Sequence, residues 1–251
     1  MKQDSTSELP AETRIRLHGE KTISDIIRQI DAKDEQNNFR WESFSAALLN
    51  SLQTARVFVD CGAEFGFYTY LALKRYPNCR VIAFEPEPAR FQLLKHFFGS
   101  YSNAVIYPYA LADHAGEIAI YKPGDSASCT IDKNLSQFDN LRVDGMKVPT
   151  VALDDILKDM PVDVVKMDIE GAEVLAFAGM SRILKVQRPL IYIEMHPKYI
   201  TSIRKDGMEF IAKLLKDSHY LITNASGSAQ SLAGRIILVP EEQGHNVFKD
   251  K

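Results

Sequence analysis

Residues 57–66 read VFVDCGAEFG, an apolar strand that ends at Asp60 and runs into a turn with two glycines. Gly62 and Gly66 stand in that turn, and a helical pattern follows it. Glycine permits a tight turn and lets a ligand approach the main chain without a Cβ in the way. This order predicts the first strand, ligand-binding turn and helix of a Rossmann-like α/β fold.

The same turn disfavours a dinucleotide ligand. The dinucleotide fingerprint G-x-G-x-x-G would need glycine where this chain has Glu64 and Phe67. A carboxylate repels a pyrophosphate, and a phenylalanine prevents close packing of helix on strand. Asp60 and Glu64 instead suit a cationic ligand without phosphate, such as S-adenosylmethionine with its sulfonium and ammonium groups.

A second carboxylate, Glu85, closes the next apolar run, VIAFE (81–85). One helix separates the two strands, so Glu85 is expected beside the glycine turn, at the carboxyl edge of the sheet. An acidic residue there accepts hydrogen bonds from the two ribose hydroxyls of a bound nucleoside. Together, the turn and Glu85 indicate an adenosyl ligand.

Short β-branched and aromatic runs alternate with helical stretches along the rest of the chain, a rhythm typical of βαβ crossovers and a parallel sheet. The last two apolar runs, at 221–224 and 235–240, are joined by a short link that favours a hairpin. The predicted fold class is therefore α/β, with a seven-stranded, mostly parallel sheet, helices on both faces and an antiparallel last strand. The seven predicted strands lie in 57–60, 81–85, 104–110, 162–168, 189–195, 221–224 and 235–240.

The organisation divides into an N-terminal arm with cap helices, residues 1–55, and a ligand-binding domain, residues 56–251. Residues 1–20 are polar and are expected to be a loosely held arm. Two amphipathic helices follow, the first with its apolar stripe on Ile23, Ile26, Ile27 and Ile30. The stretch 123–147 lacks periodicity, and a lid or acceptor-binding segment and a plain surface excursion both remain open for it.

Composition excludes several classes of protein. The 251 residues are 45% hydrophobic and 25% charged with a net charge of −3, so the chain can bury a core and has no overall basic character for nucleic acid. No apolar run reaches the length of a membrane span, and no secretory signal is visible near the start. Cys61, Cys79 and Cys129 form neither a disulfide pattern nor a zinc motif. Cytoplasmic residence is expected; the oligomeric state is not predicted.

Across residues 56–197 the chain resembles the FkbM family of S-adenosylmethionine-dependent methyltransferases. The resemblance is carried by VFVDCGAEFGFYT, VIAFEPEP, ALADHAGE, VPTVALDDIL, VVKMDIEGAEVLAFAG and IYIEMHP. It implies the class I methyltransferase fold and O-methylation of hydroxyls on sugars or small natural products. It also implies that the cofactor-binding residues include Asp60, Gly62, Ala63, Gly66, Glu85, Ala110 and Leu111. Tyr109 departs from the small polar residue common at its position.

A polar group is expected where the fourth and fifth parallel strands end. Lys166 and Asp168 share one face of VDVVKMD, while Glu194 and His196 share one face of LIYIEMH. A buried lysine and glutamate are costly unless they are paired, so a Lys166–Glu194 ion pair is expected. Asp168 and His196 lie further out and are the two candidates for the base that removes the hydroxyl proton.

A second mechanism remains open, in which Asp168, Glu194 and His196 hold Mg²⁺. Metal ligands are otherwise not assigned. Glu170 and Glu173 stand at a helix start, where they are interpreted as complementing the helix dipole.

The leading hypothesis is an S-adenosylmethionine-dependent O-methyltransferase acting on a hydroxyl of a sugar, glycan or small natural product. Two alternatives are kept: a catalytically silent module that binds the cofactor, and a methyltransferase acting on an amine or a nucleic acid. Against the last, the fourth strand is followed by Asp168-Ile169-Glu170-Gly171 and not by an Asn/Asp-Pro-Pro-aromatic segment.

Overall fold

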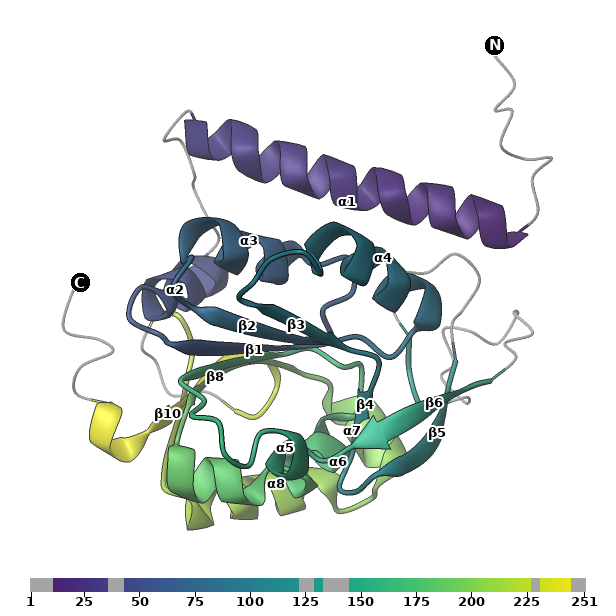
Figure 1. Cartoon of the computed structure of the whole chain (residues 1–251). Coiled ribbons are helices and arrows are strands. Elements are labelled where there is room, and N and C mark those ends of the chain that lie inside the picture. Colours follow the sequence, from purple (N-terminus) through teal and green to yellow (C-terminus); the bar gives the residue numbers. More distant parts are fainter. Residues whose placement is uncertain (1–10, 36–42, 122–128, 133–144, 227–230, 245–251) are drawn as a thin grey trace.

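The computed structural model describes residues 11–35, 43–121, 129–132, 145–226 and 231–244. Its main sheet has seven strands in the order β3-β2-β1-β7-β8-β10-β9 (Figure 1). Strand β10 runs antiparallel to both of its neighbours, whereas β3, β2, β1, β7 and β8 pair in parallel. This confirms the predicted α/β fold with a seven-stranded, mostly parallel sheet and an antiparallel last strand. The strands are β1 (Val57–Cys61), β2 (Arg80–Phe84), β3 (Ala104–Tyr107), β7 (Val164–Met167), β8 (Leu190–Met195), β9 (Tyr220–Thr223) and β10 (Gly234–Pro240).

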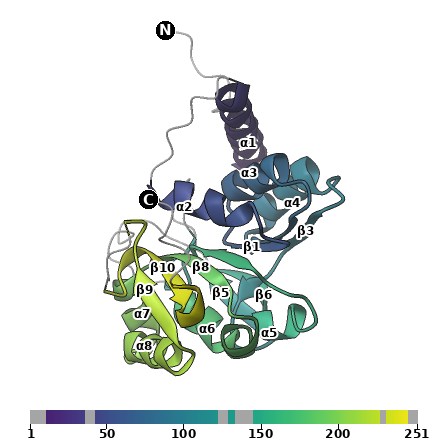
Figure 2. The same cartoon turned by 90° about the vertical axis from the view of Figure 1, so that its left-hand side faces the viewer.

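Helices cover both faces of this sheet, because its strands are apolar on both sides (Figures 1 and 2). One face carries α2 (Ser43–Leu52), α3 (Phe67–Arg75) and α4 (Pro88–Phe98). The other carries α5 (Leu153–Ile156), α6 (Glu173–Ala178), α7 (Pro197–Ile203) and α8 (Gly207–Asp217). Two short turns complete the described helical elements, η2 (Ile183–Gln187) and η3 (Glu241–Gln243).

The N-terminal helix α1 (Ala11–Glu35) lies across α3 and α4 and not against the sheet (Figures 1 and 2). Its apolar stripe packs as predicted, with Ile23 and Ile30 completely buried. The helix begins at Ala11, within the segment through residue 20 for which a loosely held arm is expected from the sequence. Local polarity does not exclude a helix, because a long helix needs only one apolar stripe to dock.

Helix α2 is bonded directly to the sheet. The Tyr192 hydroxyl of β8 lies 2.6 Å from Ser51 Oγ and donates to the Ala47 carbonyl at 2.9 Å. At the other end of α2, Ser45 Oγ lies 3.0 Å from the hydroxyl of Tyr68, a residue of α3. The helix is therefore held on this face of the sheet, between β8 and Tyr68 of α3.

A three-stranded sheet, which the sequence analysis did not predict, lies between β3 and β7 in the chain. Its order is β4-β6-β5, and its strands are β4 (Ala110–Leu111), β5 (Gly116–Ile120) and β6 (Met146–Val151). Most of the 123–147 stretch is outside the described residues. Its described part includes Thr130, which is paired with Tyr121 through two main-chain hydrogen bonds.

Among the helices in the described ranges, none combines the length and the apolar character that crossing a lipid bilayer requires.

Candidate active site

A cavity of about 370 Å³ opens at the carboxyl ends of the central parallel strands, where open α/β sheets bind their ligands. Its volume lies within the range of small-molecule sites. Its floor and walls combine residues of the β1–α3 turn, the end of β2, the β3–β4 connection, the segment after β7 and strand β10. The lining residues are Gly62, Ala63, Glu64, Phe67, Tyr68, Phe84, Glu85, Pro86, Arg90, Tyr109, Ala110, Leu111, Ile120, Cys129, Ile131, Lys166, Asp168, Ile169, Glu170, Ala172 and Arg235.

The turn after β1 keeps its glycine because the main chain after β7 comes very close. Gly62 has φ of +79°, and a Cβ there would stand 2.0 Å from the carbonyl oxygen of Asp168. Gly66 has φ of +80°, and a Cβ there would stand 2.4 Å from Cε2 of Phe98. Gly62 thus lines the cavity, whereas the described surroundings of Gly66 are the side chains of α4 that it packs against.

Lys166 pairs with Asp60, and the predicted Lys166–Glu194 pair is wrong. Its ammonium donates to the Gly62 carbonyl at 2.9 Å and lies 3.5 Å from Asp60 Oδ1. Asp60 is 1% exposed and accepts a hydrogen bond of 2.7 Å from Thr69. The strand register decides this pairing: β1 and β7 are neighbours and place Asp60 directly beside Lys166.

Burial and the neighbouring carboxylates shift the pKa of Lys166 in opposite directions. Burial lowers its pKa, but the charges of Asp60 and Asp168 outweigh burial, and the net direction is upward. Lys166 therefore remains charged, and its hydrogen bond to the Gly62 carbonyl stabilises the glycine turn.

Glu85 projects into the cavity from the end of β2, as expected. It is 3% exposed, and its two carboxylate oxygens accept hydrogen bonds from the main-chain N–H groups of Glu64, at 2.8 Å, and Glu87, at 3.0 Å. Burial raises the pKa of Glu85 to about 7, against the lowering effects of Arg90 and of these two hydrogen bonds. Each carboxylate oxygen can accept more than one hydrogen bond, so Glu85 is held in place and can still accept from a ligand.

Aromatic and aliphatic groups line the cavity wall contributed by the β3–β4 connection. Ala110 and Leu111, which the resemblance to the FkbM family implies as cofactor-binding residues, both line it, together with Tyr109. The Tyr109 ring is tilted against Tyr107, with ring centroids 6.0 Å apart. This side of the cavity offers apolar surface for a flat ring system.

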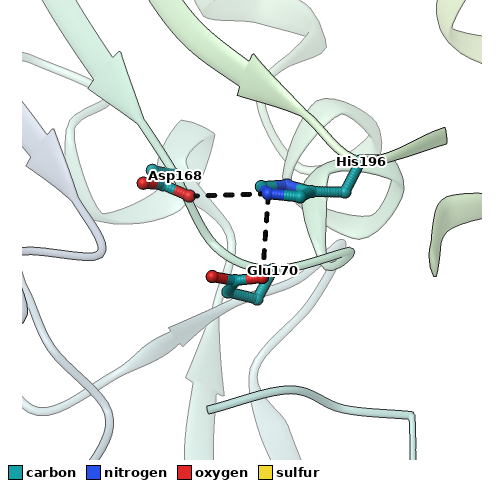
Figure 3. Close-up of side chains that lie close together, drawn as sticks. All are labelled: Asp168, Glu170 and His196. Atoms are coloured by element: carbon teal, nitrogen blue, oxygen red, sulfur yellow. Dashed lines mark ion pairs between the residues drawn. The ribbon is translucent and has the colours of Figure 1, made fainter. Parts of the chain in front are cut away.

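Asp168, Glu170 and His196 converge at the opposite side, after β7 and β8 (Figure 3). His196 Nε2 lies 4.0 Å from Asp168 Oδ1 and 3.7 Å from Glu170 Oε2. Asp168 and Glu170 line the cavity; His196 is not among the lining residues and stacks on Tyr199 with ring centroids 5.6 Å apart. Asp168 Oδ1 is a buried oxygen without a hydrogen-bond partner in the described structure.

A fully buried carboxylate fixes the His196 ring. Glu173 is 0% exposed, and its Oε1 lies 2.9 Å from His196 Nδ1. Burial lowers the pKa of His196, but the hydrogen bond to Glu173 and the charges of Glu173, Glu170 and Asp168 outweigh it and raise the pKa to about 9. The imidazole is therefore protonated near neutral pH.

The group that could hold a metal differs from the predicted one. Ligand atoms of Asp168, Glu170 and His196 all lie within 4.8 Å of one another. Glu194, predicted as a third ligand, instead accepts a hydrogen bond from Arg235 at 2.8 Å, because Arg235 stands opposite it on β10. Carboxylate and imidazole donors suit several divalent ions, and a ligating histidine commonly donates its other N–H to a carboxylate, as His196 can to Glu173.

Nothing in the sequence indicated that several of the lining residues would reach the cavity. Tyr68 and Arg235 reach the cavity only through the packing of α3 and β10 beside the parallel strand ends. Glu170 carried a signal, since it follows Asp168 at a strand end, but it was interpreted as a helix-dipole residue. Its φ of +51° directs the chain so that Glu170 faces the cavity.

The family profile described as "Methyltransferase FkbM domain" matches residues 60–222 of this chain. Among curated proteins, the chain is similar to the hexuronic acid methyltransferase AglP of Haloferax volcanii, with 25% identity over 212 residues that cover 80% of this chain and 82% of that protein. It is also similar to methyltransferase sdnD of Sordaria araneosa, with 24% identity over 153 residues, 49% of this chain and 59% of that protein.

Two solved structures resemble the fold. A methyltransferase FkbM from Methylobacillus flagellatus gives a TM-score of 0.46 at 17% identity, covering 86% of this chain and 60% of that chain. An O-methyltransferase from Bacillus cereus gives a TM-score of 0.44 at 14% identity, covering 87% of this chain and 89% of that chain.

Proposed function

The chain belongs to the FkbM methyltransferase family, and from that membership we propose that it transfers the methyl group of S-adenosylmethionine to a hydroxyl of a sugar-containing acceptor. The observation that carries the proposal is that Glu85 and Asp168 line the same cavity. Glu85 is suited to bind a ribose, and Asp168 is suited to bind a reacting hydroxyl. Cytoplasmic residence is part of the proposal, because none of the three cysteines takes part in a disulfide bond.

The cofactor half of the cavity is the side of β1 and β2. Glu85 accepts hydrogen bonds from the two ribose hydroxyls. Gly62 and Ala63, which have little or no side chain, leave the main chain accessible to the methionine part of the cofactor. Ala110 and Leu111 form the cavity wall next to the adenine ring. Further proposed contributors are Asp60, which with Lys166 supports the turn from beneath, and Gly66, which lets α3 begin close to α4.

The fit of a cationic cofactor is supported by the carboxylates that line the cavity. Four lining residues are carboxylates, namely Glu64, Glu85, Asp168 and Glu170. When bound, S-adenosylmethionine supplies a sulfonium-activated methyl group for in-line displacement. The chain then has two tasks, to align the acceptor oxygen with that methyl group and to take the hydroxyl proton.

We assign the removal of the acceptor hydroxyl proton to Asp168. Its carboxylate lines the cavity, and its Oδ1 has no hydrogen-bond partner in the described structure, so it can accept one from the acceptor hydroxyl. His196, the other predicted base, acts here as a positively charged support, because it is already protonated and is held by Glu173. A carboxylate base of this kind contributes typically about 10²–10⁴-fold to the rate.

The cluster also supports a second mechanism: Asp168, Glu170 and His196 would hold a divalent ion, which would supply a Lewis acid that lowers the pKa of the acceptor hydroxyl. The two mechanisms differ in one measurement. Turnover that survives exhaustive chelation supports Asp168 as the base, whereas turnover lost on chelation and restored by added Mg²⁺ or Mn²⁺ supports the metal.

The proposal is tested with Asp168→Asn, assayed with methyl-labelled S-adenosylmethionine and a panel of sugars and glycans. We expect turnover to fall at least about 100-fold while the affinity for S-adenosylhomocysteine stays within twofold. Asp206→Asn is the matched control, because Asp206 is an exposed carboxylate outside the cavity. An Asp168→Asn variant that turns over at the wild-type rate contradicts the assignment. A wild-type protein that binds the cofactor and methylates nothing is the silent binding module.

A glycan acceptor is supported by the likeness to a hexuronic acid methyltransferase. Transfer to a hydroxyl gives an ether that resists mild alkali. A methylated product that mild alkali hydrolyses is an ester and contradicts the hydroxyl as acceptor, and transfer to an amine or a nucleic acid base contradicts the sugar.

A further inference from the structure

Three cationic side chains line the described part of the cavity, and two of them are buried. The Arg90 side chain is 5% exposed and lies 3.9 Å from the Glu87 carboxylate, and its guanidinium lies over the Phe65 ring. The Lys166 side chain is 9% exposed and donates to the Gly62 carbonyl. The third cation, Arg235, differs from both: 47% of its side chain is exposed.

Arg235 stands at the end of the cavity away from Glu85. The sheet order β2-β1-β7-β8-β10 places Glu85 at one end of the row of strands and Arg235 at the other. Neighbouring strands lie about 4.8 Å apart, so β10 is about 10 Å from β7, which carries Asp168 at its end. Because the cofactor half is the side of β1 and β2, the space between Asp168 and Arg235 is left for the acceptor.

The Arg235 side chain is built into this position. Its Nε donates to Glu194 Oε2 at 2.8 Å, and its guanidinium lies over the Phe44 ring, 5.8 Å from the ring centroid. Phe44 is in turn packed edge-on against Tyr192, with ring centroids 5.7 Å apart. A guanidinium oriented by a carboxylate and an aromatic ring loses little conformational freedom on binding, which suits planar recognition of an anion.

We propose that Arg235 determines acceptor specificity by binding a carboxylate on the acceptor sugar, so that the enzyme selects acidic sugars over neutral ones. This inference rests on the proposed function. The lining carboxylates support it: Glu64, Glu85, Asp168 and Glu170 repel a carboxylate from the rest of the cavity, where the cations Arg90 and Lys166 are buried. An acidic acceptor is therefore admitted in one orientation, with its carboxylate at β10 and its hydroxyls toward Asp168.

The test compares two acceptors that differ only in the group on C5, p-nitrophenyl β-D-glucuronide and p-nitrophenyl β-D-glucoside. We expect the wild-type enzyme to prefer the glucuronide, and Arg235→Gln to raise the KM for the glucuronide about 10- to 100-fold. The KM for the glucoside, kcat and the affinity for S-adenosylhomocysteine are expected to change less than twofold. Arg235→Lys keeps the charge but loses the planar fork, and it is expected to give an intermediate KM.

Arg204→Gln is the matched control. Arg204 also donates through Nε to a carboxylate, Asp206 at 2.9 Å, and lies over an aromatic ring, that of Phe210, but it does not line the cavity. It is expected to leave both acceptors unaffected.

Three outcomes overturn the inference: no preference of the wild-type enzyme for the glucuronide, equal loss of both acceptors in Arg235→Gln, or no change in that variant. If the wild-type enzyme methylates other sugars but not the glucuronide, the inference fails while the proposed function stands. If S-adenosylhomocysteine does not bind at all, the proposed function itself fails.

Discussion

Replacing Glu85 by alanine removes the carboxylate that we assign to the cofactor ribose. Two ribose hydroxyls donate to this carboxylate in the proposed complex, and a hydrogen bond to a charged group contributes about 1.5–3 kcal/mol. The loss of both amounts to about 3–6 kcal/mol, which is about 10²–10⁴-fold in the dissociation constant of S-adenosylhomocysteine. The variant also leaves the main-chain N–H groups of Glu64 and Glu87 without their present acceptors, so it is expected to be less stable as well.

Calorimetric titration with S-adenosylhomocysteine at pH 8 measures the effect, because Glu85, whose pKa burial raises to about 7, is mostly ionised there. Asp154→Ala controls for the stability loss. Asp154 also holds two main-chain N–H groups, those of Arg182 at 2.7 Å and Ile183 at 2.9 Å, but it does not line the cavity. Binding by Glu85→Ala within threefold of wild type refutes the role of Glu85, and a matching loss in Asp154→Ala refutes the explanation through direct contact.

Four further predictions follow from the same geometry. Wild-type affinity for S-adenosylhomocysteine should weaken as pH falls through about 7, because the raised pKa of Glu85 means that its carboxylate is lost below that pH; calorimetry from pH 8 to 6 measures this. His196, with its pKa raised from 6.5 to about 9, adds stability that is fully present below pH 6.5 and is lost as pH rises through about 9; the free energy of unfolding should therefore drop between about pH 6.5 and 9 in wild type, and an equal drop in His196→Gln contradicts this. Glu173→Gln should lower the His196 pKa in an NMR titration of the imidazole, since it removes the largest of the effects that raise it. Gly66→Ala should destabilise the fold by about 1–3 kcal/mol, measured by urea unfolding, because the added Cβ meets Phe98 in a left-handed backbone.

Most of the main sheet was predictable, because strands buried on both faces must be continuously apolar and their crossovers need helices of about the observed length. The glycine turn, Glu85 and Asp168 could be placed for the same reason, since each directly follows a predicted strand and parallel strands end at one edge. The small sheet of β4, β5 and β6 was missed, because short strands around a long connection carry little periodicity.

The pairing of charges could not be predicted. Lys166 was expected to pair with Glu194 on the strand that follows β7 in the chain, but β7 also lies beside β1, and the parallel register there places Asp60 against Lys166. Glu194 is bound instead by Arg235, whose strand inserts antiparallel beside β8. Strand alternation tells which face a side chain occupies, but not which neighbour stands opposite it.

The sequence by itself determined the architecture, the edge of the sheet at which the cavity opens and the strand-end carboxylates, because these depend on local periodicity and on residues adjacent in the chain. Only the tertiary structure decided that Glu173 fixes His196, that Glu170 faces the cavity and that Arg235 stands at its far end. The physical reason is that a charged side chain is stabilised by the nearest opposite charge in space, and distance along the chain does not measure that proximity.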